Sequence, residues 1–116
     1  MKTRSSLSIA AVLAACLFAP AVANAVDSWH QEKLKFVYPL GNGDFVLGFQ
    51  SNSPSCASTS NPQYFYVSAG AYGVTAEGVK AMLATALMAL ATEKSIAIAF
   101  DGTSPYCYIN RFSVQN

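Results

Sequence analysis

A single segment of the chain has the periodicity of an α-helix, and it lies between segments that have the periodicity of β-strands. The apolar positions of residues 75–93 recur at helical spacing and form one stripe: Val79, Met82, Leu83, Ala86, Leu87 and Leu90. Thr75 is a favourable N-cap, and Glu77 complements the helix dipole in the first turn. One helix inserted among strands predicts an α+β fold.

The strand patterns lie on both sides of this helix. Residues 34–40 and 45–50 flank a Gly-Asn-Gly turn and predict a hairpin, and residues 63–69 predict a third strand. Two more follow the helix at residues 95–100 and 106–114. The order βββαββ predicts a small five-stranded antiparallel sheet or an OB-like partly closed barrel. We expect the barrel first, and an open sheet with the helix on one face is the alternative.

Alternation along these strands indicates which side chains face the core. Phe45, Leu47 and Phe49 are expected to point inward, as are Phe65 and Val67 of the third strand. The strand after the helix alternates large and small residues, with Ile96, Ile98 and Phe100 inward. Pro39 cannot donate a backbone hydrogen bond, so we expect it at a sheet edge or a bulge.

The N-terminus has the pattern of an export signal. Lys2 and Arg4 precede an uncharged apolar stretch, and small residues around Ala25 resemble a cleavage site. The sequence therefore predicts a signal peptide at residues 1–25 and one secreted or periplasmic domain at residues 26–116. A lipoprotein anchored through Cys16, which ends a lipobox-like Leu-Ala-Ala-Cys, is the alternative. The apolar run is too short for a stable membrane span.

Removal of the signal leaves two cysteines, Cys56 and Cys107. In an oxidising compartment these predict a disulfide that closes a loop of about 50 residues and stabilises the fold by roughly 4 kcal/mol. The same domain has five basic and six acidic side chains, a formal net charge of −1. A nucleic-acid partner is therefore not expected.

Catalytic and metal-binding patterns are missing from this domain. Its single histidine, His30, lies near the predicted new N-terminus, where we expect a frayed segment. The six carboxylates are scattered, and no nucleophile motif accompanies them. We therefore expect a protein that is not an enzyme and that has no catalytic residues, metal or cofactor.

Tyrosine with serine and asparagine is the composition of recognition surfaces. The tyrosines Tyr64, Tyr66, Tyr72, Tyr106 and Tyr108 are our candidates for a ligand-binding surface. Ordinary cross-strand packing is the alternative. The outer face of the predicted helix is almost uncharged, and Ala81, Ala84, Thr85 and Met88 on it are candidates for a subunit contact in a homo-oligomer. An exposed, weakly polar face is the alternative.

Residues 74–101, followed by the Cys-Tyr-Ile-Asn-Arg run that starts at Cys107, resemble small uncharacterised secreted proteins of Gram-negative bacteria. The helix, short joint and strand are distantly similar to the binding (B) subunits of pertussis-like and subtilase-type AB5 toxins. The resemblance implies an OB-fold with a disulfide, assembly as a ring around the helices, and binding of cell-surface glycans. No sugar-contacting residue of that family matches a position here.

The function expected is therefore a non-catalytic binding module, with a glycan or a protein as ligand. The alternative is a monomeric secreted inhibitor or envelope accessory protein. It would bind a protein partner through the polar loop that begins at Ser51 and ends at Pro62.

Overall fold

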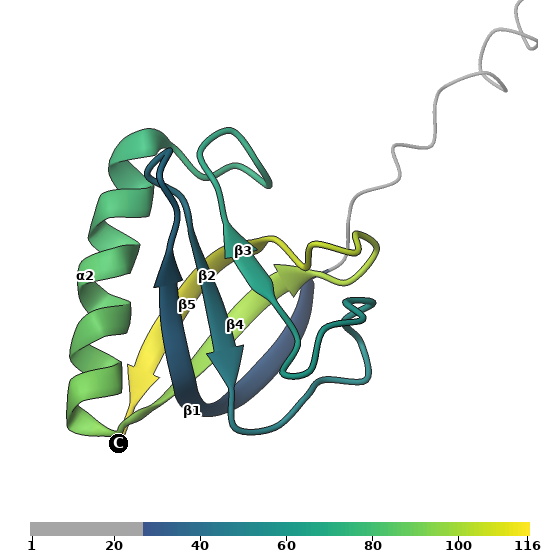
Figure 1. Cartoon of the computed structure of the whole chain (residues 1–116), viewed down its shortest axis with the longest axis vertical. Coiled ribbons are helices and arrows are strands. Elements are labelled where there is room, and N and C mark those ends of the chain that lie inside the picture. The colour runs from purple at the N-terminus through teal and green to yellow at the C-terminus, as the bar shows by residue number, and fades with distance from the viewer. Residues whose placement is uncertain (1–26) are drawn as a thin grey trace, which may run out of the picture.

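A computed structural model of the chain describes residues 27–116; the predicted signal peptide and Cys16 lie outside them. The elements are β1 (Asp27–Pro39), β2 (Phe45–Phe49), β3 (Phe65–Val67), α2 (Ala76–Thr92), β4 (Ser95–Asp101) and β5 (Ile109–Gln115). The strands form one antiparallel sheet in the order β3-β2-β1-β4-β5, and α2 packs on β1 and β5 (Figure 1). The α+β class with one helix and five strands is confirmed.

The sheet is coiled but is not closed into a barrel, so of the two architectures expected the open sheet is the one observed. Its edge strands are β3 and β5, and no ladder joins them within residues 27–116. One backbone hydrogen bond crosses the gap, from Tyr66 N to Tyr106 O at 3.2 Å. A three-residue β3 is too short to form a ladder with β5, which begins only at Ile109.

β1 is the central strand, and its two halves have different neighbours. Residues 27–33 pair with β4, and residues 34–39 pair with β2, with a register shift between Leu34 and Phe36. Such a bulge bends a strand and increases its twist, and β1 curves strongly in Figure 1. The sequence predicted only the second half of this strand. Pro39 is its last residue and lies beyond the part that pairs with β4, so its missing donor breaks no bond on that side.

The hydrophobic core lies between the sheet and α2. Phe45, Leu47 and Phe49 point into it as predicted, together with both inward residues of β3 and all three of β4. Three aromatic rings form its centre: Phe65 lies 5.2 Å from Phe49 and 5.1 Å from Phe100, in edge-to-face geometry. Such pairs stabilise a core beyond the area that they bury.

α2 begins and ends where the sequence predicted. The Thr75 hydroxyl accepts a hydrogen bond from Gly78 N at 3.0 Å, and Glu93 closes the helix in the left-handed conformation at φ 56°. The prediction for Leu87 was wrong: this side chain is 47% exposed, whereas Ala89 is fully buried. The close contact with the sheet uses the small residues Ala86 and Ala89, which turns the bulkier Leu87 outward.

The predicted disulfide is present. Cys56 and Cys107 are joined with their Cα atoms 5.7 Å apart, and both are buried. The bond connects the loop after β2 to the segment before β5. It therefore links the two sides of the gap between the edge strands β3 and β5, which we call the open seam of the sheet.

Gly48 of β2 lies opposite Phe36 of β1, and the Phe36 ring covers it. A Cβ at Gly48 would lie 2.3 Å from two atoms of that ring. An aromatic ring over a strand glycine replaces the side-chain packing that glycine lacks. The pair thus fixes the ring of Phe36 on the face of the sheet that points away from α2.

We expect Gly48→Ala to lower the free energy of unfolding by about 1–3 kcal/mol, because the Phe36 ring has to leave its place. Urea denaturation followed by circular dichroism measures this change. The matched control is Gly41→Ala, since a Cβ at Gly41 has no atom within 4 Å. Equal losses of stability in the two variants would show that the Phe36 ring does not constrain Gly48.

Candidate ligand-binding surface

Six aromatic side chains gather on the face of the sheet that points away from α2, and we call them the aromatic face. They come from β1, from the segment at and before β3 and from the segment before β5: Phe36, Tyr38, Tyr64, Tyr66, Tyr106 and Tyr108. None of them belongs to the core cluster beneath the helix. Residues far apart in sequence thus form one surface.

The rings of the aromatic face touch in an unbroken series. Tyr64 lies 5.9 Å from Phe36 and 6.2 Å from Tyr38, and its ring is 6.3 Å from that of Tyr66. Tyr66 in turn lies 5.4 Å from Tyr106 and 6.3 Å from Tyr108. Most of these pairs are edge-to-face, the geometry that aromatic quadrupoles favour. The aromatic face is therefore preformed, and we also refer to these six side chains as the platform.

The floor of the platform is Val46, which stands in register between Tyr38 and Tyr66 and is only 1% exposed. Because Val46 is buried, the neighbouring aromatic rings must cover it on this face of the sheet. Beside it lies a shallow groove of about 380 Å³, lined by Phe36, Val37, Tyr38, Pro39 and Tyr64. The groove is wide open to solvent.

The platform has no charged side chain, and its polar atoms are the tyrosine hydroxyls. Within residues 27–116, none of its five hydroxyls bonds to another protein group. Tyr38 is 48% exposed and Tyr106 is 50% exposed. Apolar area combined with a few free hydroxyls is what a ligand with both apolar and hydroxyl-bearing surfaces would bind.

Four of the five candidate tyrosines belong to this platform, and Tyr72 does not. Phe36 and Tyr38 were not among the candidates. No pattern in the sequence indicated them, because strict alternation from the inward Leu34 would place both in the core. The bulge after Leu34, which the sequence did not reveal, reverses the alternation and places them on the outer face.

Tyr72 instead holds the start of β1. Its hydroxyl donates a hydrogen bond to one carboxylate oxygen of Asp27, and Arg111 contacts the other at 3.0 Å. The Arg111 guanidinium also stacks over the ring of Trp29, 5.1 Å from its centre. Trp29, Ala99 and Arg111 are in register across three strands, so the small Ala99 leaves room for this contact.

These contacts shift two pKa values in opposite directions. The Tyr72 hydrogen bond is the main cause that lowers the pKa of Asp27, and Arg111 adds to it while burial opposes it. The same hydrogen bond raises the pKa of Tyr72 to about 12. Both shifts favour the pair in which tyrosine is protonated and aspartate is charged.

His30 is not in a frayed segment, which corrects the expectation from the sequence. It lies within β1, with its ring 5.2 Å from Phe49 and 5.9 Å from Phe65, and its Nε2 donates to Ser51 O at 3.0 Å. Nearby, Lys33 N and the Ser51 hydroxyl donate to Glu32 and lower its pKa. The first half of β1 is thus hydrogen-bonded to the loop after β2.

The loop at residues 51–62 is organised by Gln63, which lies beyond its end and is 8% exposed. The Gln63 amide accepts from Ser53 N at 2.7 Å and donates to the carbonyls of Ser53 and Cys56 at 3.0 and 3.1 Å. Every polar atom of this amide is therefore bonded within the loop. The loop is a fixed base for the neighbouring Tyr64.

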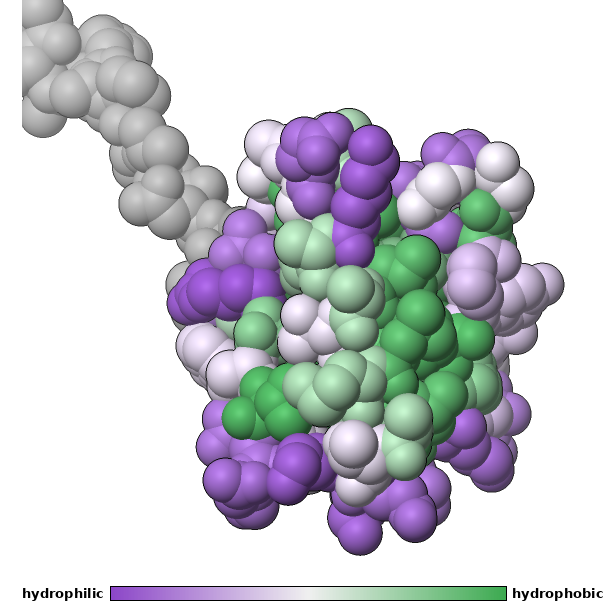
Figure 2. All heavy atoms as spheres, turned by 90° about the vertical axis from the view of Figure 1, so that its left-hand side faces the viewer, coloured by the Kyte–Doolittle hydropathy of each residue, from purple (hydrophilic) through white to green (hydrophobic). Residues whose placement is uncertain are grey.

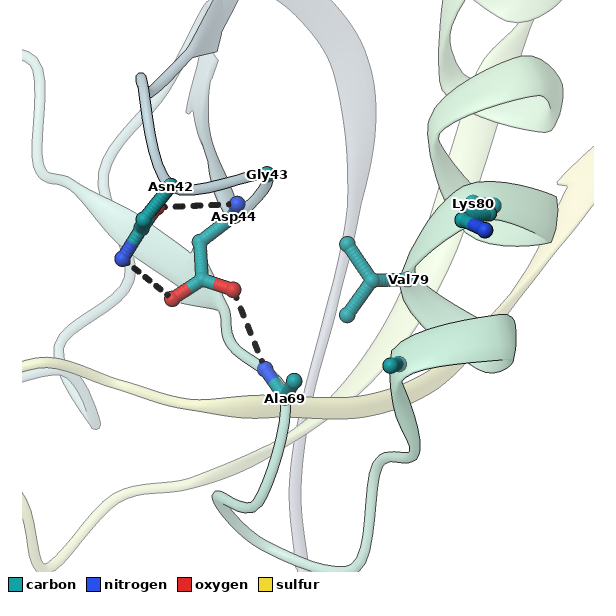
Figure 3. A pocket seen from close by; sticks show the side chains of 7 residues that line it. Asn42, Gly43, Asp44, Ala69, Val79 and Lys80 are labelled. Carbon is teal, nitrogen blue, oxygen red and sulfur yellow. Dashed lines mark hydrogen bonds between the residues drawn. The ribbon is translucent and has the colours of Figure 1, made fainter.

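A small pocket of about 120 Å³ lies between the β1–β2 turn and α2 (Figure 3). Val79 points into it from the helix, and Asp44 stands on the opposite side. The Asp44 carboxylate accepts from Ala69 N and from the Asn42 amide, at 3.1 and 3.2 Å. The Asp44 carboxylate is thus already hydrogen-bonded within the protein, so we assign no ligand to this pocket.

The four candidate subunit-contact residues lie on the outer surface of α2. Ala81 and Ala84 are exposed, Met88 is 45% exposed beside Leu87, and Thr85 is partly covered. The Thr85 hydroxyl donates to Ala81 O at 3.0 Å, and that of Thr92 donates to Met88 O at 2.8 Å. Figure 2 shows apolar and weakly polar residues along this side of the molecule.

No family model matches the chain, and no curated protein matches its sequence. In the part that the structure describes, no helix is long and apolar enough to cross a bilayer. The same part contains no group of three or more side chains arranged to hold a metal ion.

We expect Tyr72→Phe to raise the pKa of Asp27 toward its ordinary value, because the main hydrogen bond to the carboxylate is lost. NMR titration of the Asp27 carboxyl carbon measures this. A lowered folded pKa stabilises the fold at a pH above the unfolded value of about 3.9. That stabilisation is lost as the pH falls through the folded pKa, so the variant should lose less stability on acidification.

Tyr108→Phe is the control, since this tyrosine makes no bond to Asp27. The same Asp27 pKa in both variants would contradict the assigned hydrogen bond.

Proposed function

We propose that the protein is a non-catalytic binding module, exported from the cell, whose aromatic face binds a neutral saccharide. The observation that carries the proposal is the unbroken series of six uncharged rings, in which none of the five tyrosine hydroxyls bonds to another protein group of residues 27–116. Saccharide rings offer C–H faces that pack on aromatic rings and hydroxyls that exchange hydrogen bonds with tyrosine. A strongly charged ligand would find no partner on this face.

The resemblance to toxin B subunits implies the same ligand class, and the open sheet differs from the closed barrel that the resemblance also implies. The exposure of Leu87 and Met88 supports a second part of the proposal, which is self-association through α2. An apolar helix face is more stable when a second copy covers it. A ring or dimer would also present several aromatic faces together and raise the avidity for a multivalent glycan.

We expect the exported protein to bind neutral saccharides on a glycan array, and Tyr66→Ala to weaken that binding at least about tenfold, since Tyr66 joins the two halves of the platform. Tyr66→Phe keeps the ring and should retain most of the affinity. Tyr72→Phe changes a tyrosine outside the platform and is the matched control. A blank array would remove the saccharide proposal, and exclusive binding of charged glycans would contradict it.

For self-association, we expect sedimentation velocity to find an oligomer at high micromolar concentration and Met88→Glu to dissociate it, because the variant places a charge in an apolar contact. Gln31→Glu adds the same charge to an exposed residue of β1 and should leave the oligomer intact. A monomeric wild-type protein at that concentration would contradict this part of the proposal.

A further inference from the structure

The aromatic face is divided by the open seam of the sheet. Tyr64 and Tyr66 lie on one side, at and before β3, and Tyr106 and Tyr108 lie on the other, in the segment before β5. Across the seam, the ring contacts of Tyr66 are accompanied by one backbone hydrogen bond to Tyr106 O. One such bond contributes only about 1 kcal/mol. The other end of the segment is held to β4, because Asp101 N donates to Tyr108 O at 2.9 Å.

The disulfide supplies the covalent link across this seam. Cys107 stands between Tyr106 and Tyr108, in the left-handed conformation at φ 46°. Its partner Cys56 is held by the amide of Gln63, the residue before Tyr64, at 3.1 Å. Tyr106 and Tyr108 are therefore each one residue away from Cys107, and Tyr64 is one residue away from Gln63, which holds Cys56.

The remaining structure does not depend on this link in the same way. The ladders of β1 with β2 and with β4, and that of β4 with β5, include neither Cys56 nor Cys107. α2 packs mainly on β1 and β5. Both cysteines belong to the same buried cluster as Val79, Ala86 and Ala89 of the helix. Loss of the disulfide should thus loosen the segment before β5 around Tyr106, while these ladders stay formed and Tyr108 O keeps its bond from Asp101 N.

We propose that the Cys56–Cys107 disulfide is a redox-sensitive positioning device for the aromatic face. When it is formed, the six rings are contiguous; when it is reduced, Tyr106 and Tyr108 separate from Tyr66. The effect on binding rests on the proposed function, whereas the effect on the rings does not. The chain would become competent to bind only where its thiols are oxidised.

The chemistry of the switch is a two-electron thiol–disulfide exchange. With dithiothreitol, the S–S bond breaks, each cysteine sulfur takes up one electron and one proton, and the dithiol becomes a cyclic disulfide. The reverse step needs a disulfide-bearing oxidant, which accepts two electrons and two protons from the thiols. Free thiols of the two cysteines are therefore the only covalent difference between the states.

The test compares the oxidised protein with the dithiothreitol-reduced protein and with the Cys56→Ala/Cys107→Ala variant. We expect amide exchange at Tyr106–Tyr108 to rise at least about tenfold more than exchange within α2. The nuclear Overhauser contacts between the rings of Tyr66 and Tyr106 should be lost. Far-UV circular dichroism should retain the helix signal, and binding to the neutral glycan array should fall at least about tenfold.

Val79→Ala is the matched control, because it weakens the domain from the buried side of α2 and leaves the seam intact. It should keep the contacts between Tyr66 and Tyr106. Two results would overturn the proposal: unchanged ring contacts after reduction, or loss of the helix signal together with the contacts. If the oxidised protein binds no array saccharide, the proposed function fails, and the exchange and ring contacts still decide this inference.

Discussion

The bulge in β1 is the constraint on which the rest of the structure depends. Before it, even-numbered residues such as His30 and Leu34 share the face of the inward residues of the neighbouring strands. Strict alternation beyond Leu34 would send Phe36 and Tyr38 into the core as well. The extra residue reverses the parity, so Val37 packs inward and the two rings point out. One irregularity thus divides the aromatic residues between core and surface.

The same bulge lets one strand serve two neighbours in succession. β1 pairs with β4 over its first half and with β2 over its second, and the bend between them coils the sheet around the core. The coiling brings β3 close to the segment before β5, although no ladder forms there. The seam is therefore narrow enough for a disulfide and for ring contacts between Tyr66 and Tyr106.

The helix and four of the strands were predictable because their patterns are local. The 3.6-residue spacing and the Thr75 cap place α2 almost to the residue, and alternation identifies β2 and β4. The first half of β1 was missed because its sequence, with His30, Glu32 and Lys33, has no apolar alternation. Its place in the sheet comes from pairing with β4, a long-range contact that no local pattern encodes. The error at Leu87 is similar, because the helix rotation depends on how closely Ala86 and Ala89 approach the sheet.

The candidate surface was predictable in part for the same reason. Outward tyrosines of β3 follow from alternation, and those beside Cys107 follow from their proximity to a cysteine expected to pair. Phe36 and Tyr38 join them only through the bulge, and Tyr72 leaves them only through its bond to Asp27. Trp29 and Arg111 meet across Ala99, and this contact requires the register of three strands. Each of these outcomes is a property of the assembled sheet.

The two threonines on the outer side of α2 change how that side meets water. Their hydroxyl hydrogens are directed to carbonyls one turn earlier in the same helix, so each hydroxyl can only accept a hydrogen bond from its surroundings. This surface of α2 is therefore less polar than its amino-acid composition suggests. Water beside it has few groups to bond, and its release on contact with any apolar body would be favourable in entropy near room temperature.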